Sequence, residues 1–297
     1  MEQAGVVVEP APIAAYERRT ILRQLGLLSM NGLGPESAPP VRIGLIDSPV
    51  CTDHPVFSSA RIEQYPHIVS LPDADARHGT FIASILVGSG AGVLGIAPRG
   101  TLVSLPVQDA QFQQHALPAR EASLRIAGAI DDALDRGVDL IQMSMDFLPE
   151  ADPDFGPVCR ALGRAASRGV CTVVAAGNQP RIGSSAVLAQ LGVLPVAMAD
   201  RHARFHANSP MGIAIGRGLS CRGENLPGAL PPNSITRASG SSFAAAVVCG
   251  TVALLKGIKP RLSSLQIVHA RGDRRGASLV PPMLNAQRWL AALSHIH

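Results

Sequence analysis

Short apolar runs alternate along the chain with segments whose apolar residues repeat every three or four positions. Continuous apolar runs of this length, bounded by turn residues, are typical of buried strands. Strands that alternate with helices form a mainly parallel sheet covered on both faces, so we expect a three-layer fold of class α/β, with helices on each side. Sites in such folds lie at the carboxyl ends of the strands. The predicted strands are residues 42–47, 101–107, 138–143, 170–175 and 193–198.

Helices are predicted between these strands. Residues 119–136 place apolar residues on one face and end before Gly137, and glycine is typical of a helix end. Residues 157–168 begin with a proline, which suits a first helical turn. The apolar run 81–87 predicts a buried helix, and a long Ala- and Val-rich helix is predicted to open at Ser242.

The first part of the chain differs from the rest. We predict that residues 1–40 form an N-terminal extension, with a helix over 13–28 and then a loop rich in proline and glycine. Residues 41–297 are predicted to form one domain. The extension is either a short pro-segment or a helix packed permanently on that domain, and the sequence leaves both alternatives open.

The composition is that of a globular protein with a large core. Of 297 residues, 46% are hydrophobic and 16% charged, and 26 basic against 22 acidic residues leave a formal net charge of +4. The densest basic cluster lacks the interleaved aromatic residues of nucleic-acid-binding surfaces, so we expect no nucleic-acid partner. This cluster consists of Arg271, Arg274 and Arg275.

No segment predicts export or membrane insertion. The N-terminal residues lack the basic and apolar regions of a signal peptide, and no uninterrupted apolar run has the length of a membrane helix. The five cysteines are odd in number and show no CxxC spacing, which favours reduced thiols over disulfides or a zinc site. We therefore expect a cytoplasmic protein with no membrane contact and no metal site.

Four polar residues stand at the ends of the predicted elements. Asp47 closes the first strand, His78 begins a helix, Asn178 follows a strand, and Ser242 opens the long helix. Each residue alone is typical of a turn, a cap or a solvated side chain. Together they supply the nucleophile, base, orienting carboxylate and oxyanion donor of acyl transfer. Their order along the chain, Asp then His then Ser, is the order found in subtilisin.

The segments around these residues resemble those of the subtilisin-like serine peptidases, family S8. The resemblance runs from about residue 41 to residue 295, and it implies that Ser242 is the nucleophile, with Ser241 on the threonine of the family's GTS. It also implies that His78 is the general base and then acid, that Asp47 orients it, and that Asn178 completes the oxyanion hole. The matching segments are RIGLID followed by HP, HGTFIASIL, GVLGIAP, VDLIQMSM, GVCTVVAAGN, RFHANSPMG and GSSFAAAVVCG.

The same resemblance implies a substrate groove, but the sequence departs from the family there. Asp146 and Phe147 stand in place of two glycines that let the substrate backbone approach. Either the loop is rerouted, or the groove is narrowed so that bulky residues near the scissile bond are disfavoured and Asp146 pairs with a basic substrate residue. Pro49 and Ala246 are further departures. The implied groove residues are Ser144, Met145, Asp146, Phe147, Ala175, Ala176 and Gly177.

The resemblance implies a serine endopeptidase that acts on a peptide or protein. No cofactor is signalled, although members of the family often bind Ca²⁺. We expect a narrow-specificity processing peptidase that removes a leader or propeptide from one cognate precursor. Peptidases of this kind mature ribosomally made peptides or the small subunit of a quinohaemoprotein amine dehydrogenase. The alternative is a catalytically silent subtilisin-like protein that binds a peptide or a partner.

Overall fold

The protein is represented by a computed structural model that describes residues 23, 39–66, 75–90, 95–109, 112, 117–147, 154–183, 185–270 and 278–294. Nearly all of the predicted N-terminal extension and the whole of the basic cluster at residues 271–275 lie outside the described residues.

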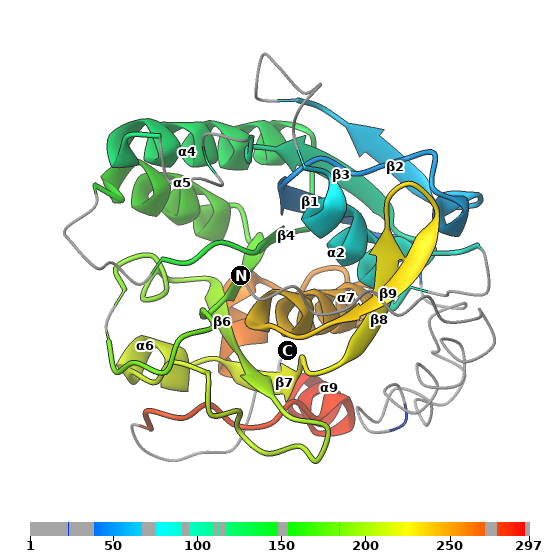
Figure 1. The fold of residues 1–297 in the computed structure, drawn as a ribbon. Helices are drawn as coiled ribbons and strands as arrows, with labels where there is room; N and C mark the ends of the chain where they lie inside the picture. Colours follow the sequence, from blue (N-terminus) through cyan, green and yellow to red (C-terminus); the bar gives the residue numbers. More distant parts are fainter. Residues whose placement is uncertain are drawn as a thin grey trace.

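Seven parallel strands form the central sheet in the order β2-β3-β1-β4-β5-β6-β7 (Figure 1). The five predicted strands are present and end within two residues of their predicted limits, whereas β2 and β7, at the two edges, were not predicted. The strands are β1 (Arg42–Asp47), β2 (Arg61–Gln64), β3 (Thr101–Pro106), β4 (Leu140–Met143), β5 (Cys171–Ala175), β6 (Val193–Ala199) and β7 (Leu219–Arg222).

Helices cover both faces of the sheet, which confirms the predicted three-layer α/β/α fold (Figure 1). One face packs against α4 (Ala119–Asp135), α5 (Gly156–Ser167) and the short α6 (Ile213–Gly216). The other face packs against α2 (Arg77–Val87), α7 (Ser241–Ile258), α8 (Ser264–His269) and α9 (Ala286–Ser294). Successive residues of a strand therefore enter different cores: on β1, Leu45 joins the core under α7 and Ile46 the core under α4.

The central helix α7 is apolar because protein surrounds it. Every residue from Ser241 to Gly257 is buried. By length and composition α7 resembles a membrane-crossing helix, yet 94% of it lies inside the fold, as expected for a core helix.

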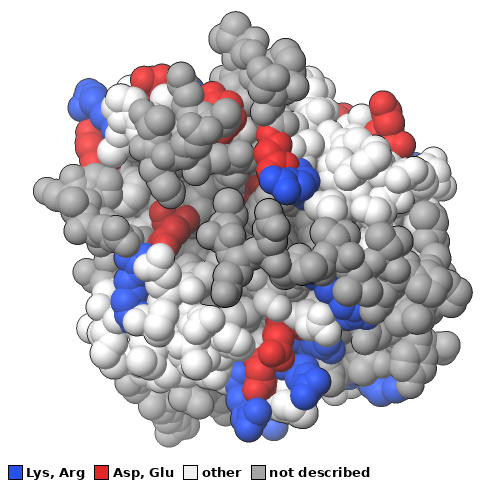
Figure 2. Space-filling view, viewed as in Figure 1, with Lys and Arg blue, Asp and Glu red and all other residues white. Residues whose placement is uncertain are grey.

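A hairpin and a short helix complete the face that carries α2. β8 (Leu226–Leu230) and β9 (Ser234–Ala238) pair antiparallel, and β8 packs against α2, where the Ala229 N–H donates to Ser84 Oγ at 3.0 Å. The 3-10 helix η2 (Pro55–Phe57) also contacts α2. On the face shown in Figure 2, basic and acidic groups of the described residues lie beside one another in several places.

Candidate active site

Three neighbouring strands end at the edge of the sheet where the predicted site residues gather. β1 ends at Asp47, Ser144 directly follows β4, and Asn178 lies shortly after β5. Because β1, β4 and β5 are adjacent and parallel, their carboxyl ends lie side by side. Strand order alone thus brings together residues that are far apart in the sequence.

A short hydrogen bond joins the end of β1 to the first turn of α2. His78 Nδ1 lies 2.6 Å from Asp47 Oδ1, and the Asp47 side chain is fully buried while that of His78 is 33% exposed. The Ser48 N–H donates to the same Asp47 oxygen at 2.7 Å. A carboxylate that accepts the Nδ1–H leaves Nε2 unprotonated in the neutral ring. This tautomer is the one that a general base requires.

The start of α2 rests directly on the loop after β1. The Gly79 N–H donates to Ser48 Oγ at 2.8 Å. A Cβ on residue 79 would overlap the carbonyl oxygens of Ser48 and Pro49, so only glycine allows this close approach. Pro49, the departure after the aspartate, therefore contributes to the surface that positions the turn carrying His78.

The surroundings of His78 favour its protonated form. Burial of the ring lowers its pKa, but the charge of Asp47 and the hydrogen bond to it raise the pKa, and the charge of Asp75 raises it further. The net result is a pKa above the ordinary value of about 6.5. A histidine in this state holds a proton well once it has taken one from a neighbouring group.

The two serines at the start of α7 have different surroundings. Ser241 is fully buried, and its hydroxyl accepts the Gly177 N–H at 3.2 Å. Ser242 is 8% exposed, and its hydroxyl has no hydrogen-bond partner in the part of the chain that the structure describes. Both lie in the first helical turn, whose N–H groups have no partner within the helix and carry positive partial charge. Of the two, Ser242 has the hydroxyl available for chemistry.

Asn178 is anchored to the same helix start. The Ser241 N–H donates to Asn178 Oδ1 at 2.7 Å. Because an N–H can only donate, this contact assigns the amide orientation and leaves Nδ2 as a donor on an exposed side chain. An exposed amide donor beside a helix N-terminus has the chemistry required to stabilise an oxyanion.

An aromatic contact brings His78 to the segment that carries Ser242. The ring centroid of Phe243 lies 5.8 Å from that of His78 and 4.4 Å from that of Phe81. Among the described residues no hydrogen bond joins His78 to Ser242, and such bonds are often long in free enzymes and shorten when substrate binds. The structure therefore brings together Asp47 with His78, and Asn178 with Ser241, as two bonded pairs.

The loop after β4 offers unpaired main chain beside this group. Main-chain groups of Ser144 and Met145 make no backbone hydrogen bond within the described residues, although β4 immediately before them is paired on both sides. By contrast, Ala176 continues the pairing of β5, because its N–H donates to Val196 O at 2.9 Å. An extended peptide can pair with free main chain of this kind as an added strand.

The side chains of Asp146 and Phe147 point in different directions. Phe147 is 2% exposed and lies in the core beneath α4 and α5, with its ring centroid 5.4 Å from that of Phe155. The expectation that Phe147 projects into a groove is therefore wrong, because the ring is drawn into an apolar core. Asp146 is exposed and pairs with Arg181 at 3.1 Å, so the chain itself supplies its basic partner.

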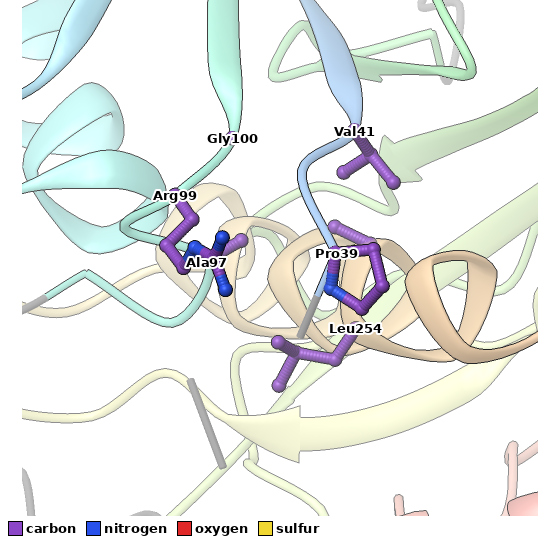
Figure 3. Close-up of a pocket in the computed structure, with 7 residues that line it drawn as sticks. Pro39, Val41, Ala97, Arg99, Gly100 and Leu254 are labelled. Atoms are coloured by element: carbon purple, nitrogen blue, oxygen red, sulfur yellow. The ribbon is translucent and has the colours of Figure 1, made fainter. Parts of the chain in front are cut away.

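Metal binding and buried thiols give no second site of these two kinds among the described residues. These residues contain no group of three His, Cys, Asp or Glu that could hold a metal ion. Burial raises the pKa of the Cys171 and Cys221 thiols to about 12, so neither is an activated nucleophile. A pocket lined by Pro39, Val41 and Gly100, among others, lies at the amino ends of β1 and β3, away from the edge that carries Asp47 (Figure 3).

The fold places the chain among the subtilisin-like serine endopeptidases, which are hydrolases. The chain matches the subtilase family, Peptidase_S8, over residues 40–271, and it belongs to that family. The family match spans the strand ends, α2 and α7 from which the site is built.

Curated relatives and a solved structure agree with this classification. The chain is 28% identical to the thermostable alkaline protease of Halalkalibacterium halodurans over 64% of its own length, although it spans only 50% of that protease. It is 24% identical to subtilisin DY of Bacillus licheniformis, over 76% of this chain and 80% of the relative. The patellamide maturation protease PatA is 27% identical, with a TM-score of 0.72 over 86% of this chain and 98% of PatA.

Three residues at the site were not predicted from the sequence: Ser48, Phe243 and Arg181. Phe243 is the one aromatic residue in the Ala- and Val-rich run after Ser242, which was a usable signal. Ser48 and Arg181 act through contacts with segments distant in sequence, and no local pattern marks such contacts.

Proposed function

We propose that this protein hydrolyses peptide bonds with Ser242 as nucleophile. His78 Nε2 takes the hydroxyl proton as Ser242 Oγ attacks the carbonyl carbon, and it then donates that proton to the leaving amine. Asp47 holds the ring in the required tautomer and stabilises the imidazolium that forms. Asn178 Nδ2 and the Ser242 N–H stabilise the oxyanion. Water then hydrolyses the acyl-enzyme by the same steps.

One observation carries this proposal. The Asp47–His78 hydrogen bond and the Asn178–Ser241 hydrogen bond lie at the same edge of the sheet, and Phe243 of α7 contacts the His78 ring. These two bonded pairs support the assignment of a base with its orienting carboxylate and an oriented amide donor to Ser242, the serine whose hydroxyl is not already bonded. A purely structural role for these four residues gives no reason for the difference between Ser241 and Ser242.

We further infer that the substrate is an extended peptide segment and that the protein is a processing peptidase with few substrates. The free main chain of Ser144 and Met145 supports pairing with an extended peptide. The likeness to PatA, which is named as a maturation protease, supports removal of a leader or propeptide from a precursor. We propose that one cognate precursor is the principal substrate and that processing takes place in the cytoplasm.

Labelling with a fluorophosphonate probe tests the chemistry. We expect the wild type to be labelled and Ser242→Ala to be unlabelled, with kcat lower by about 10⁶, the order measured when this type of nucleophile is removed. Ser241→Ala is the matched control, because its hydroxyl is bonded to Gly177, and it should still be labelled. Labelling that survives in Ser242→Ala but disappears in Ser241→Ala would show that Ser241 is the nucleophile and would contradict the proposal. A wild type that is never labelled would favour the silent, peptide-binding alternative.

The processing role needs a separate measurement. Peptides that accumulate in cells lacking the active protein should be few, and the purified enzyme should cut them rapidly while leaving casein nearly intact. Efficient digestion of casein would contradict a dedicated processing role without affecting the proposed chemistry.

A further inference from the structure

Two loops at the carboxyl ends of β6 and β7 carry arginines without a carboxylate partner. Arg222 is the last residue of β7, and its Nε donates to Glu224 O at 3.3 Å. Arg201 lies just after β6, is exposed, and donates from Nε to His202 Nε2 at 3.2 Å. Neither guanidinium forms an ion pair within the described part of the chain, whereas Arg164, for example, is paired with an aspartate. Both groups can therefore bind an anionic group from another molecule.

The two arginines belong to one surface, because both contact Glu224. The Arg201 N–H donates to the Glu224 carboxylate at 2.9 Å, and Arg222 donates to the carbonyl of the same residue. The nearby Asp200 carboxylate accepts the Arg204 N–H at 2.9 Å and Arg204 Nε at 3.0 Å. The two carboxylates thus hold main-chain N–H groups in place and organise the loops that present the arginines.

Backbone conformation also fixes these loops. Ala203 and Asn225 are the non-glycine residues with a positive φ among those described, at 60° and 52°, and each lies in one of the two loops. Such conformations are uncommon outside glycine and persist where the surrounding structure imposes them. The Asn225 N–H is in addition bonded to Ser239 Oγ at 2.9 Å. The arginines are therefore carried by main chain with a defined conformation.

This surface lies across the start of α7 from the peptide-pairing main chain of Ser144 and Met145. The strand order β4-β5-β6-β7 places the ends of β6 and β7 beyond β5, on the side away from β4. The Gly240 N–H, two residues before Ser242, donates to Gly223 O at 3.0 Å, and a Cβ on Gly223 would overlap Gly240 O. Neighbouring strands lie about 4.8 Å apart, so the end of β7 is about 14 Å from the end of β4, a distance that about four extended residues cover.

We propose that Arg201 and Arg222 bind an acidic segment of the peptide substrate, about four to six residues from the segment that pairs with Ser144 and Met145. The inference rests on the proposed peptidase function and adds a contact outside the groove in which the bond is cut. Carboxylates are the expected partners, because guanidinium groups bind them through charge-assisted hydrogen bonds. A peptide that occupies the groove and this surface together is held at two points, which favours one precursor over peptides that fill the groove alone.

Binding of short charged peptides tests the surface without turnover. Fluorescein-labelled hexaglutamate, hexaglutamine and hexalysine are titrated with the full chain in the Ser242→Ala background, and anisotropy reports binding. Hexaglutamate should bind at least about tenfold more tightly than the other two, and less tightly as salt rises from about 0.05 to about 0.5 M. Arg201→Gln and Arg222→Gln should each weaken its binding about fivefold, and the double variant up to about 25-fold.

Arg160→Gln is the matched control. Arg160 is exposed on α5, which packs on the opposite face of the sheet from α7, and it forms no ion pair among the described residues. This variant loses the same charge as either test variant and should bind hexaglutamate as tightly as the parent. Thermal unfolding of each variant checks that it is folded.

Cleavage then tests whether the surface acts on substrate. Internally quenched peptides with the cleavage sequence of the accumulating precursor carry a run of Glu or of Gln, placed from about two to about eight residues beyond the scissile bond. For the wild type, the ratio of kcat/KM for the Glu peptide to that for the Gln peptide should reach about tenfold at one placement. The ratio should fall toward one in the double variant of Arg201 and Arg222.

Hexaglutamate binding that is lost in the double variant and kept in Arg160→Gln, with a matching fall in the cleavage ratio, would support the proposal. Absence of hexaglutamate binding, equal weakening in Arg160→Gln, or an unchanged ratio would overturn it. Tighter binding of a thymidine oligonucleotide than of hexaglutamate would also overturn it and would assign the surface to nucleic acid. Failure of the peptidase function would be seen separately, as absence of Ser242-dependent labelling in the wild type.

Discussion

His54 and His78 occupy the same side of the sheet, but they meet different partners. His54 is 2% exposed and caps η2, where Nδ1 accepts the Val56 N–H at 3.0 Å and Nε2 donates to Ser234 O on β9 at 3.1 Å. His78 is paired through Nδ1 with the Asp47 carboxylate. One ring thus bridges two stretches of main chain, and the other is joined to a buried charge.

The partners decide the direction of each pKa shift. Burial lowers the pKa of both rings. For His54 the main-chain carbonyls of Ser234 and Leu230 raise the pKa too little to compensate, so its pKa falls below the ordinary value. For His78 burial is the largest single effect, but the charge of Asp47, the hydrogen bond to it and the charge of Asp75 together outweigh burial, so its pKa rises. A carboxylate partner therefore distinguishes a histidine equipped to accept a proton from one that joins two segments as the neutral ring.

The largest expected effect on turnover comes from removing the carboxylate that partners His78. Asp47→Asn should lower kcat by about 10⁴, because the amide stabilises the wrong tautomer of His78 and no longer balances the imidazolium. His54→Gln is the control, since His54 lies outside the proposed catalytic group, and it should change kcat by less than about threefold. Steady-state kinetics on the identified precursor peptide provide the measurement. A kcat for Asp47→Asn within tenfold of the wild type would show that the carboxylate does not act through His78.

The pH dependence of turnover gives an intermediate effect. His78 must be neutral to accept a proton, so kcat/KM should fall about tenfold for each pH unit below its pKa. Because the pKa is raised, the midpoint of this fall should lie above about 6.5. The same shift means that the Asp47–His78 pair adds stability that is fully present below pH 6.5 and is lost as the pH rises through the raised pKa. Rate profiles and an NMR titration of His78 should agree, and a midpoint at or below pH 6.5 would contradict the assignment.

Burial explains which strands could be predicted from the sequence. β1, β3, β4, β5 and β6 lie inside the sheet and read as continuous apolar runs. The edge strands do not: β2 reads RIEQ with no buried residue, and β7 reads LSCR. The hairpin strand β8 contains proline and glycine, which weaken any strand signal. Local pattern was therefore informative where a strand is a continuous apolar run, and burial alone was not enough, because β7 is buried at three positions but too short and too polar to stand out.

The site was predictable to the extent that it follows element ends. Asp47, Asn178 and Ser242 stand where strands end or a helix begins, and these ends were visible in the sequence. The direction of Phe147 was not visible, because the loop after β4 turns its ring toward Phe155, which lies near the start of α5. The pairing of Asp146 with Arg181 also joins distant segments, and only the folded chain brings them together.

The smallest expected effect concerns His54 and is a change in how the free energy of unfolding depends on pH. Its lowered pKa means that the native state binds this proton less readily than the unfolded chain, so the stability it contributes is present above about pH 6.5 and is lost as the pH falls toward the lowered pKa. Protonation would also remove the acceptor for the Val56 N–H. Both proteins are compared in the Ser242→Ala background, which prevents self-digestion. Between pH 7.5 and 5.5 the free energy of unfolding should fall in both, and the fall should be smaller by about 0.5–1 kcal/mol in His54→Gln than in its parent. Urea unfolding at the two pH values measures the difference, and because Asp47 and His78 are unchanged in both proteins, their opposite contribution cancels. An equal loss in both proteins would mean that main-chain partners alone do not hold His54 in its neutral form.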